Sequence, residues 1–144
     1  MAEQNDLDLS YLRMAYIWSN LSQARRKKVG CLIVKNGTII SDGFNGTPSG
    51  FDNDCESWLD GSWVTNPETL HAESNAITKL AKSTQSSDGA TIYTTCVPCL
   101  ECAKLIIQAG INRVVFRETY RKLDGLLLLK RANIDIKRIK VINE

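Results

Sequence analysis

The sequence predicts an α/β protein in which helices cover a mixed, five-stranded sheet. An Asn-Gly pair joins two β-rich runs near residue 36, and helical and β patterns then alternate from residue 71 onward. A hairpin supplies antiparallel strands, whereas alternating helices and strands supply parallel strands with helices on the sheet faces. Because the 144 residues show no internal repeat and no linker, we expect one domain over residues 1–144.

A helix and a hairpin are expected in the N-terminal part of the chain. Apolar residues such as Leu12 and Tyr16 recur at helical spacing, which predicts an amphipathic helix over residues 8–21. Two strands, 29–34 and 38–41, are expected on either side of the Asn-Gly turn.

Residues 42–70 are expected to form a long loop, because glycine and proline punctuate them. Trp58 and Trp63 lie in this segment and are expected to fill the core beneath it. The segment is acidic, and no Lys or Arg occurs between Lys35 and Lys79. An anionic ligand would therefore be bound by the basic run before the hairpin or by the basic C-terminal half.

The second half of the sequence alternates helices with strands. The periodicity and the Pro and Gly boundaries predict helices over residues 71–81, 98–109 and 123–132. Strands are expected over residues 91–95, 113–116 and 134–142.

The composition excludes several classes of protein. The net charge is only +2, from 18 basic and 16 acidic residues, so we expect no nucleic-acid partner. The longest apolar run, Leu126–Leu129, is too short to span a bilayer, and residues 1–10 do not resemble a targeting signal. We therefore expect a cytoplasmic protein with no membrane association, in a compartment where its five cysteines stay reduced.

One histidine and two cysteines have the spacing of a catalytic zinc site. Cys99 and Cys102 lie three residues apart at the start of a predicted helix, where both sulfurs can reach one ion and the helix dipole favours thiolates. His71, the only histidine, stands at the start of another helix. Three protein ligands leave the fourth position of a tetrahedral zinc ion open, as in catalytic sites.

Glu73 follows His71 by two residues, and the two can address one site only beyond the helix end. A carboxylate placed there is suited to general acid–base catalysis, since zinc lowers the pKa of water toward about 7 and the carboxylate carries the proton.

Other interpretations of the cysteines remain open. Cys99-x-x-Cys102 alone would also fit a redox pair or half of a structural zinc site. Cys55 is then the strongest candidate for a fourth ligand, although an ordinary loop thiol is favoured. Cys31 is expected to pack in the core, and Cys96 is poorly placed to be a ligand.

His-x-Glu followed by Pro-Cys-x-x-Cys is the signature of zinc-dependent nucleobase deaminases. The stretches HAESNAI, PCLECAKLIIQAGI and ETY, together with GFNGTPSG after the hairpin, extend the match. Over nearly its whole length the chain resembles the deoxycytidylate (dCMP) deaminase branch of the zinc-dependent cytidine and deoxycytidylate deaminase superfamily, in its short phage-like form. The resemblance implies a cytidine-deaminase-like, three-layer α/β/α fold.

This resemblance implies an activity and a set of site residues. Such enzymes hydrolyse dCMP to dUMP and ammonia and so supply thymidylate synthesis. By position, the zinc ligands are His71, Cys99 and Cys102, and Glu73 is the catalytic proton shuttle. A second, structural zinc in some phage members uses a further histidine, so we expect one zinc here.

The resemblance also suggests substrate contacts. Asn45 matches a position that contacts the deoxyribose, although the residue also suits the turn before Gly46. For the 5′-phosphate we favour Arg25 or Arg26, and Tyr120 is a weaker candidate.

Finally, the resemblance suggests regulation. The family is typically a hexamer activated by dCTP and inhibited by dTTP, with magnesium accompanying the triphosphate. The effector site involves the Gly-Phe-Asn-Gly turn, hence Phe44 and Gly46, and Lys79 and Lys82 would lie near it.

Two rival functions are considered. The first is another deaminase of this fold, acting on tRNA, a free nucleoside or a base; the near-neutral charge argues against tRNA. The second is a non-catalytic, zinc-stabilised binding module. Glu73 discriminates the second, because a purely structural site has no use for this carboxylate.

Overall fold

An antiparallel hairpin at one edge and parallel strands at the other make up the central sheet. The computed structural model describes residues 2–140, with the elements α1 (Gln4–Ser19), β1 (Gly30–Lys35), β2 (Thr38–Phe44), β3 (Glu56–Leu59), β4 (Ser62–Thr65), α2 (Ala72–Lys79), the 3-10 turn η1 (Leu80–Lys82), β5 (Thr91–Cys96), α3 (Leu100–Gln108), β6 (Arg113–Glu118), α4 (Asp124–Arg131) and β7 (Asp135–Arg138). The sheet order is β2-β1-β5-β6-β7. β1 is antiparallel to β2 and β5, while β5, β6 and β7 are mutually parallel.

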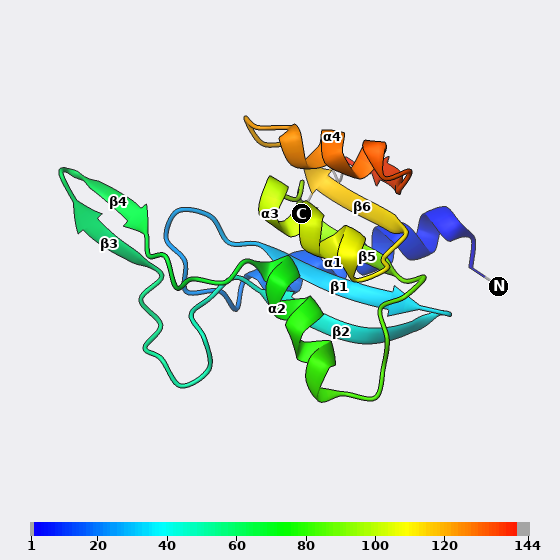
Figure 1. Cartoon of the computed structure of the whole chain (residues 1–144), viewed down its shortest axis with the longest axis horizontal. Coiled ribbons are helices and arrows are strands. Elements are labelled where there is room, and N and C mark those ends of the chain that lie inside the picture. The colour runs from blue at the N-terminus through cyan, green and yellow to red at the C-terminus, as the bar shows by residue number, and fades with distance from the viewer. Residues whose placement is uncertain (1, 141–144) are drawn as a thin grey trace.

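Helices cover both faces of this sheet, which confirms the predicted mixed five-stranded α/β architecture in three layers. Figure 1 shows α1 behind the sheet and α2, α3 and α4 in front of it. Successive residues of β1 point to opposite faces. Leu32 and Val34 pack with Leu12 of α1, whereas Cys31 and Ile33 join the larger core under the other three helices.

Several element boundaries differ from the expected ones. Helix α1 spans Gln4–Ser19 rather than residues 8–21, because its first turn is polar and carries no apolar periodicity. Strand β7 spans Asp135–Arg138, shorter than the expected 134–142. Residues 141 and 142 of that prediction lie outside the described residues.

The expectation of an unstructured loop over residues 42–70 is wrong in its centre. Strands β3 and β4 form a separate two-stranded hairpin there. Its turn is Asp60-Gly61, with φ of 48° and 81°, which suits a two-residue turn of type I′. This Asp-Gly pair between β-rich residues is the same signal that predicts the first hairpin, so the sequence contained the information.

The expectation that Trp58 and Trp63 fill the core is also wrong. Their exposed fractions are 59% and 40%, and their rings lie edge to face with centroids 5.3 Å apart. Figure 1 shows the reason, since the β3–β4 hairpin projects away from the central sheet. Within residues 2–140, no helix has both the length and the apolar character needed to cross a membrane.

A buried acid ties the N-terminal helix to the sheet. The side chain of Asp8 is fully buried, and it accepts two hydrogen bonds from the Arg113 guanidinium, at 2.7 and 2.8 Å, and one from the Tyr93 hydroxyl at 2.6 Å. Burial raises the pKa of Asp8, but hydrogen bonds from Arg113, Tyr93, Gln4 and Lys137 outweigh it and hold that pKa well below its usual range.

We expect Asp8→Asn to lower the free energy of unfolding by about 3 kcal/mol at pH 7, because it leaves Arg113 without its buried partner. The folded-state pKa of Asp8 is lowered, so its contribution is present above the unfolded pKa of about 4 and disappears as the pH falls. In denaturant unfolding, the wild-type and Asp8→Asn proteins should therefore differ less at pH 3 than at pH 7, and the difference should keep falling at lower pH. A difference that does not change with pH would contradict this role.

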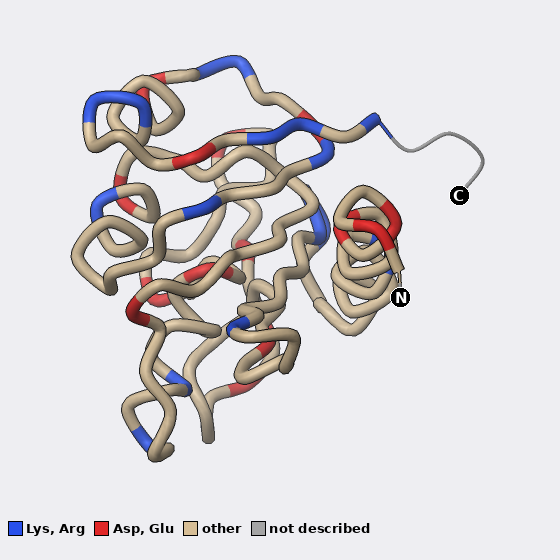
Figure 2. The backbone as a smooth tube through the Cα atoms, turned by 90° about the vertical axis from the view of Figure 1, so that its right-hand side faces the viewer, with Lys and Arg blue, Asp and Glu red and all other residues tan. Residues whose placement is uncertain are grey.

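Charge is distributed unevenly along the chain. Figure 2 shows Lys and Arg recurring along the last described segment, on the way to the C-terminus. The acidic residues of segment 42–70 belong to the opposite, hairpin-bearing part of the sequence.

Candidate functional site

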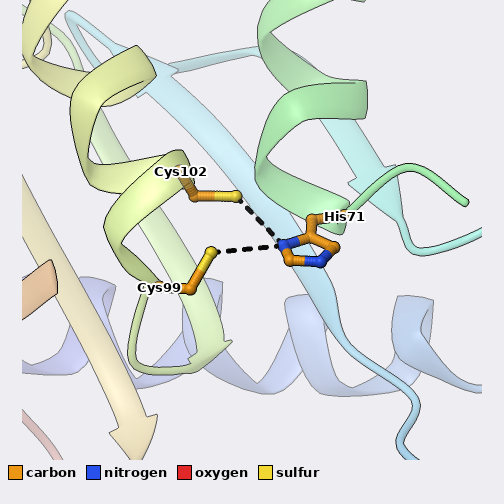
Figure 3. A group of neighbouring side chains, drawn as sticks. All are labelled: His71, Cys99 and Cys102. Carbon is orange, nitrogen blue, oxygen red and sulfur yellow. Dashed lines mark hydrogen bonds between the residues drawn. The ribbon is translucent and has the colours of Figure 1, made fainter. Parts of the chain in front are cut away.

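The three predicted metal ligands lie together where two helices begin. His71 is the N-cap of α2, Cys99 is the N-cap of α3, and Cys102 lies in the first turn of α3. The His71 Nδ1 atom is 3.4 Å from the Cys99 sulfur and 3.3 Å from the Cys102 sulfur. Figure 3 shows the imidazole facing both sulfurs across the gap between the helices.

This cluster fits a zinc ion. All ligand atoms lie within 4.8 Å of one another, and within the described part of the chain it is the one group of three or more potential ligands so arranged. In a tetrahedral site with Zn–S of about 2.3 Å and Zn–N of about 2.0 Å, nitrogen and sulfur are about 3.5 Å apart. The distances from Nδ1 to the two sulfurs are therefore close to those a bound zinc ion requires, and Nδ1 is the ring nitrogen that faces both sulfurs.

The electrostatics of the cluster favour a thiolate. Hydrogen bonding from Cys102, together with that from His71, lowers the pKa of Cys99 to about 4 despite partial burial. The hydrogen bond to Cys99 in turn raises the pKa of His71. Metal binding displaces such protons, so a site that already holds one thiolate is prepared for a cation.

Glu73 lies in the first turn of α2 and is 4% exposed. Burial raises the pKa of its carboxyl to about 7, although the charge of His71 opposes the shift. Glu73, His71 and Cys99 all line one cavity of about 740 Å³. A carboxyl that titrates near neutral pH beside a metal site is well suited to accept and return a proton.

Close backbone packing holds the two helix starts in place. The Cys31 thiol donates a hydrogen bond of 3.1 Å to the carbonyl of Ala72, between His71 and Glu73. A Cβ on Gly43 would lie 2.4 Å from the same carbonyl oxygen, and one on Gly125 would lie 2.2 Å from the Pro98 oxygen, beside Cys99. Cys31 is fully buried, as predicted, and its thiol also contributes to this packing.

Asn45 lies in the cavity wall, but its side chain already bonds to the backbone. Its Oδ1 accepts from the Val29 amide at 2.9 Å, and its Nδ2 donates to the Lys27 carbonyl at 2.8 Å. The residue therefore orders the segment before β1 as well as facing the cavity. Each end of the amide keeps one further hydrogen-bonding position.

The predicted phosphate contacts separate in space. Arg26 and Tyr120 line the cavity, whereas Arg25 is not among its lining residues and stacks over the Trp63 ring at 4.4 Å. Lys27 and Lys122 also line the cavity, and sequence reasoning did not single them out. Lys27 belongs to the basic run 25–28, but only folding distinguishes its members.

The residues suggested for regulation are brought together only in part. Phe44, Gly46 and Lys79 line a second cavity of about 300 Å³. The Lys79 ammonium pairs with the Asp42 carboxylate at 2.6 Å, and Asp42 is not among the lining residues. Lys82 follows in η1 and does not line it. Asn45 belongs to the walls of both cavities.

The remaining cysteines are free thiols. Cys55 and Cys96 are buried and border the larger cavity, yet neither joins the metal-binding group found among residues 2–140. The structure thus favours three protein ligands over a closed set of four.

Known proteins resemble this chain strongly. The family model for the cytidine and deoxycytidylate deaminase zinc-binding region matches residues 5–118. The deoxycytidylate deaminase of Enterobacteria phage T4 is 36% identical over 149 aligned positions, which cover 77% of each chain, and that of phage T2 is 34% identical over 92% of each. The crystal structure of dCMP deaminase from the cyanophage S-TIM5, in complex with dCMP and dUMP, superposes with a TM-score of 0.89 at 42% identity and covers 96% of this chain and 100% of that one.

Proposed function

The chain belongs to the cytidine and deoxycytidylate deaminase family, and on that basis we propose that it hydrolyses dCMP to dUMP and ammonia. One observation carries the proposal: Glu73 lines one cavity with His71 and Cys99, two members of the cluster that Cys102 completes, in a fold that superposes on an enzyme crystallised with dCMP and dUMP. The reaction takes place at one domain spanning residues 1–144 and supplies dUMP for thymidylate synthesis.

His71, Cys99 and Cys102 hold one catalytic zinc ion. When bound, zinc supplies Lewis acidity, which makes a water molecule nucleophilic near neutral pH. Glu73 accepts the proton of the water that attacks C4 of cytosine and delivers it to N3. It then helps transfer a proton to the departing amino group, so that dCMP and water give dUMP and ammonia. A pKa of about 7 for Glu73 suits both directions of transfer.

Substrate contacts are assigned to the cavity wall. Asn45 contacts the deoxyribose through one of the two free hydrogen-bonding positions on its amide, while its bonds to the Val29 amide and the Lys27 carbonyl keep it oriented. Arg26 and Tyr120, which both line the cavity, bind the 5′-phosphate. Arg25 was the alternative, but its guanidinium is engaged over Trp63.

Regulation and assembly form a further part of the proposal. We expect a hexamer activated by dCTP and inhibited by dTTP, each accompanied by magnesium. The second cavity, lined by Phe44, Gly46 and Lys79, is the proposed effector site, and the shared wall at Asn45 supports communication with the substrate. Five free thiols support a reducing, cytoplasmic location.

Ultraviolet absorbance of the zinc-loaded protein with dCMP, deoxycytidine and CMP tests the proposal. We expect loss of cytosine absorbance with dCMP, faster than with deoxycytidine, and a response to dCTP and dTTP. No deamination of any substrate would reject the enzymatic function. Equal rates with dCMP and deoxycytidine would reject phosphate recognition while leaving a nucleoside deaminase.

A further inference from the structure

A buried carboxylate joins the β3–β4 hairpin to the basic segment before β1. Glu56 is the first residue of β3 and is 7% exposed. Its carboxylate accepts hydrogen bonds from the Arg25 amide at 2.8 and 3.0 Å and from the Arg26 amide at 2.9 Å. Both amides lie in a stretch without regular secondary structure, so no helix or sheet would otherwise satisfy them.

The same hairpin also binds both arginine side chains. The Arg25 guanidinium lies 4.4 Å from the ring centroid of Trp63, and Arg26 Nη1 donates to the Thr65 hydroxyl at 3.2 Å. Trp63 and Thr65 are both in β4. Figure 1 shows the hairpin beside the loop that connects α1 to β1, apart from the rest of the sheet.

These contacts place the side chains of Arg25 and Arg26 in different surroundings. Arg25 is held on the hairpin, outside the residues that line the cavity, whereas Arg26, Glu56 and Thr65 all belong to the cavity wall. Arg25 and Arg26 lie in a bend, and both of their amides donate to the one carboxylate of Glu56. With the backbone held at both amides and the Arg25 side chain held over Trp63, the direction in which Arg26 leaves the backbone is fixed.

We propose that Glu56 is a positioning residue that sets the direction of Arg26, so that the β3–β4 hairpin determines selectivity for a substrate carrying a 5′-phosphate. The inference rests on the proposed function, and it adds a determinant that is neither a proposed zinc ligand nor the proton carrier. A carboxylate is suited to this task, because charge-assisted hydrogen bonds to two amides are stronger than neutral ones and hold the loop in one conformation.

Glu56 could also have the opposite effect on phosphate binding, and the two possibilities predict different results. Two adjacent amides and two arginines can form an anion site, so a buried carboxylate there could compete with a phosphate rather than assist it. Removal of the charge would then strengthen binding of dCMP. The proposed role requires the reverse, because a glutamine side chain presents one acceptor and one donor to amides that are both donors.

The test compares the zinc-loaded wild type with Glu56→Gln. We expect kcat/KM for dCMP to fall about tenfold or more, mainly through a higher KM, while kcat/KM for deoxycytidine stays the same. Affinity for dUMP, measured by calorimetry, should fall by a similar factor. Asp54→Asn is the matched control, because it removes an equal charge from an exposed side chain two residues away. It should change kcat/KM for neither substrate.

A second pair of variants tests the hairpin without disturbing the buried carboxylate. Thr65→Val removes the hydroxyl that accepts from Arg26 at nearly constant size, whereas Thr65→Ser keeps it. We expect selectivity for dCMP over deoxycytidine to fall in the first and be retained in the second. If thermal denaturation shows that Glu56→Gln does not fold, this pair still tests whether the hairpin determines selectivity for dCMP.

The results distinguish failure of the positioning role of Glu56 from failure of the proposed deaminase function. A wild type that deaminates neither substrate, or both equally, contradicts the proposed function. A wild type that prefers dCMP, with the same preference in Glu56→Gln and Thr65→Val, overturns only the positioning role. Equal losses with both substrates, or tighter dUMP binding in Glu56→Gln, also overturn it.

Discussion

Glu73→Gln is expected to reduce kcat by about 10³-fold or more while zinc remains bound. Glutamine preserves the size of the side chain but can neither accept the proton of water nor return it. The proposed metal ligands are His71, Cys99 and Cys102, so removal of this carboxylate leaves those atoms in place. Steady-state deamination of dCMP, together with elemental analysis of the purified variant, measures both quantities.

Protein stability serves as the control for this variant. Burial raises the pKa of Glu73, which means that the folded protein disfavours its ionised form, so a neutral amide should not lower the melting temperature. Loss of zinc together with activity would identify Glu73 as a ligand. Unimpaired activity would exclude it as the proton carrier, and a binding module without catalysis would show no activity to lose.

His71→Ala is expected to remove both zinc and activity. The chain contains no second histidine, and a cluster of two thiolates alone lacks the third protein ligand of a catalytic zinc site. His71 is the N-cap of α2, two residues before Glu73, so its loss also alters the start of the helix that carries this carboxyl. Zinc content and dCMP deamination should fall together, to near the background of each assay.

Cys55→Ser is the matched control for the metal site. Cys55 is buried and borders the same cavity, yet it lies outside the ligand group among the described residues. We expect this variant to retain one zinc per chain. A loss of zinc equal to that of His71→Ala would make Cys55 a fourth ligand and the site a structural one.

The wall that the two cavities share would couple the proposed effector site to the substrate cavity. Asn45 contributes to both walls and is bonded to the backbone at Lys27 and Val29, so a ligand that shifts the Gly-Phe-Asn-Gly turn also shifts the substrate cavity. The ion pair between Lys79 and Asp42 spans α2 and β2 beside that turn.

The metal cluster could be predicted from the sequence because its information is local. Cys99 and Cys102 lie within one helical turn, and His71 was the only histidine available, so few arrangements had to be considered. The first hairpin followed from its Asn-Gly turn for the same reason. Asp60-Gly61 held an equivalent signal for the second hairpin, which the glycine-rich surroundings concealed.

The cavity wall could not be predicted in the same way, because it depends on contacts between distant segments. The Glu56 carboxylate accepts hydrogen bonds from the amides of Arg25 and Arg26, which lie 31 and 30 residues earlier in the sequence. The exposure of Trp58 likewise depends on where the hairpin projects, not on its composition.

The sequence by itself predicted the fold class, the three proposed zinc ligands and the neighbouring acid, because these depend on periodicity and on short spacings at the starts of two helices. Only the tertiary structure decided which of two adjacent arginines lines the cavity and which is held on the hairpin. The physical reason is that side-chain direction in an irregular segment is set by the groups that satisfy its backbone, and here that group comes from a distant strand.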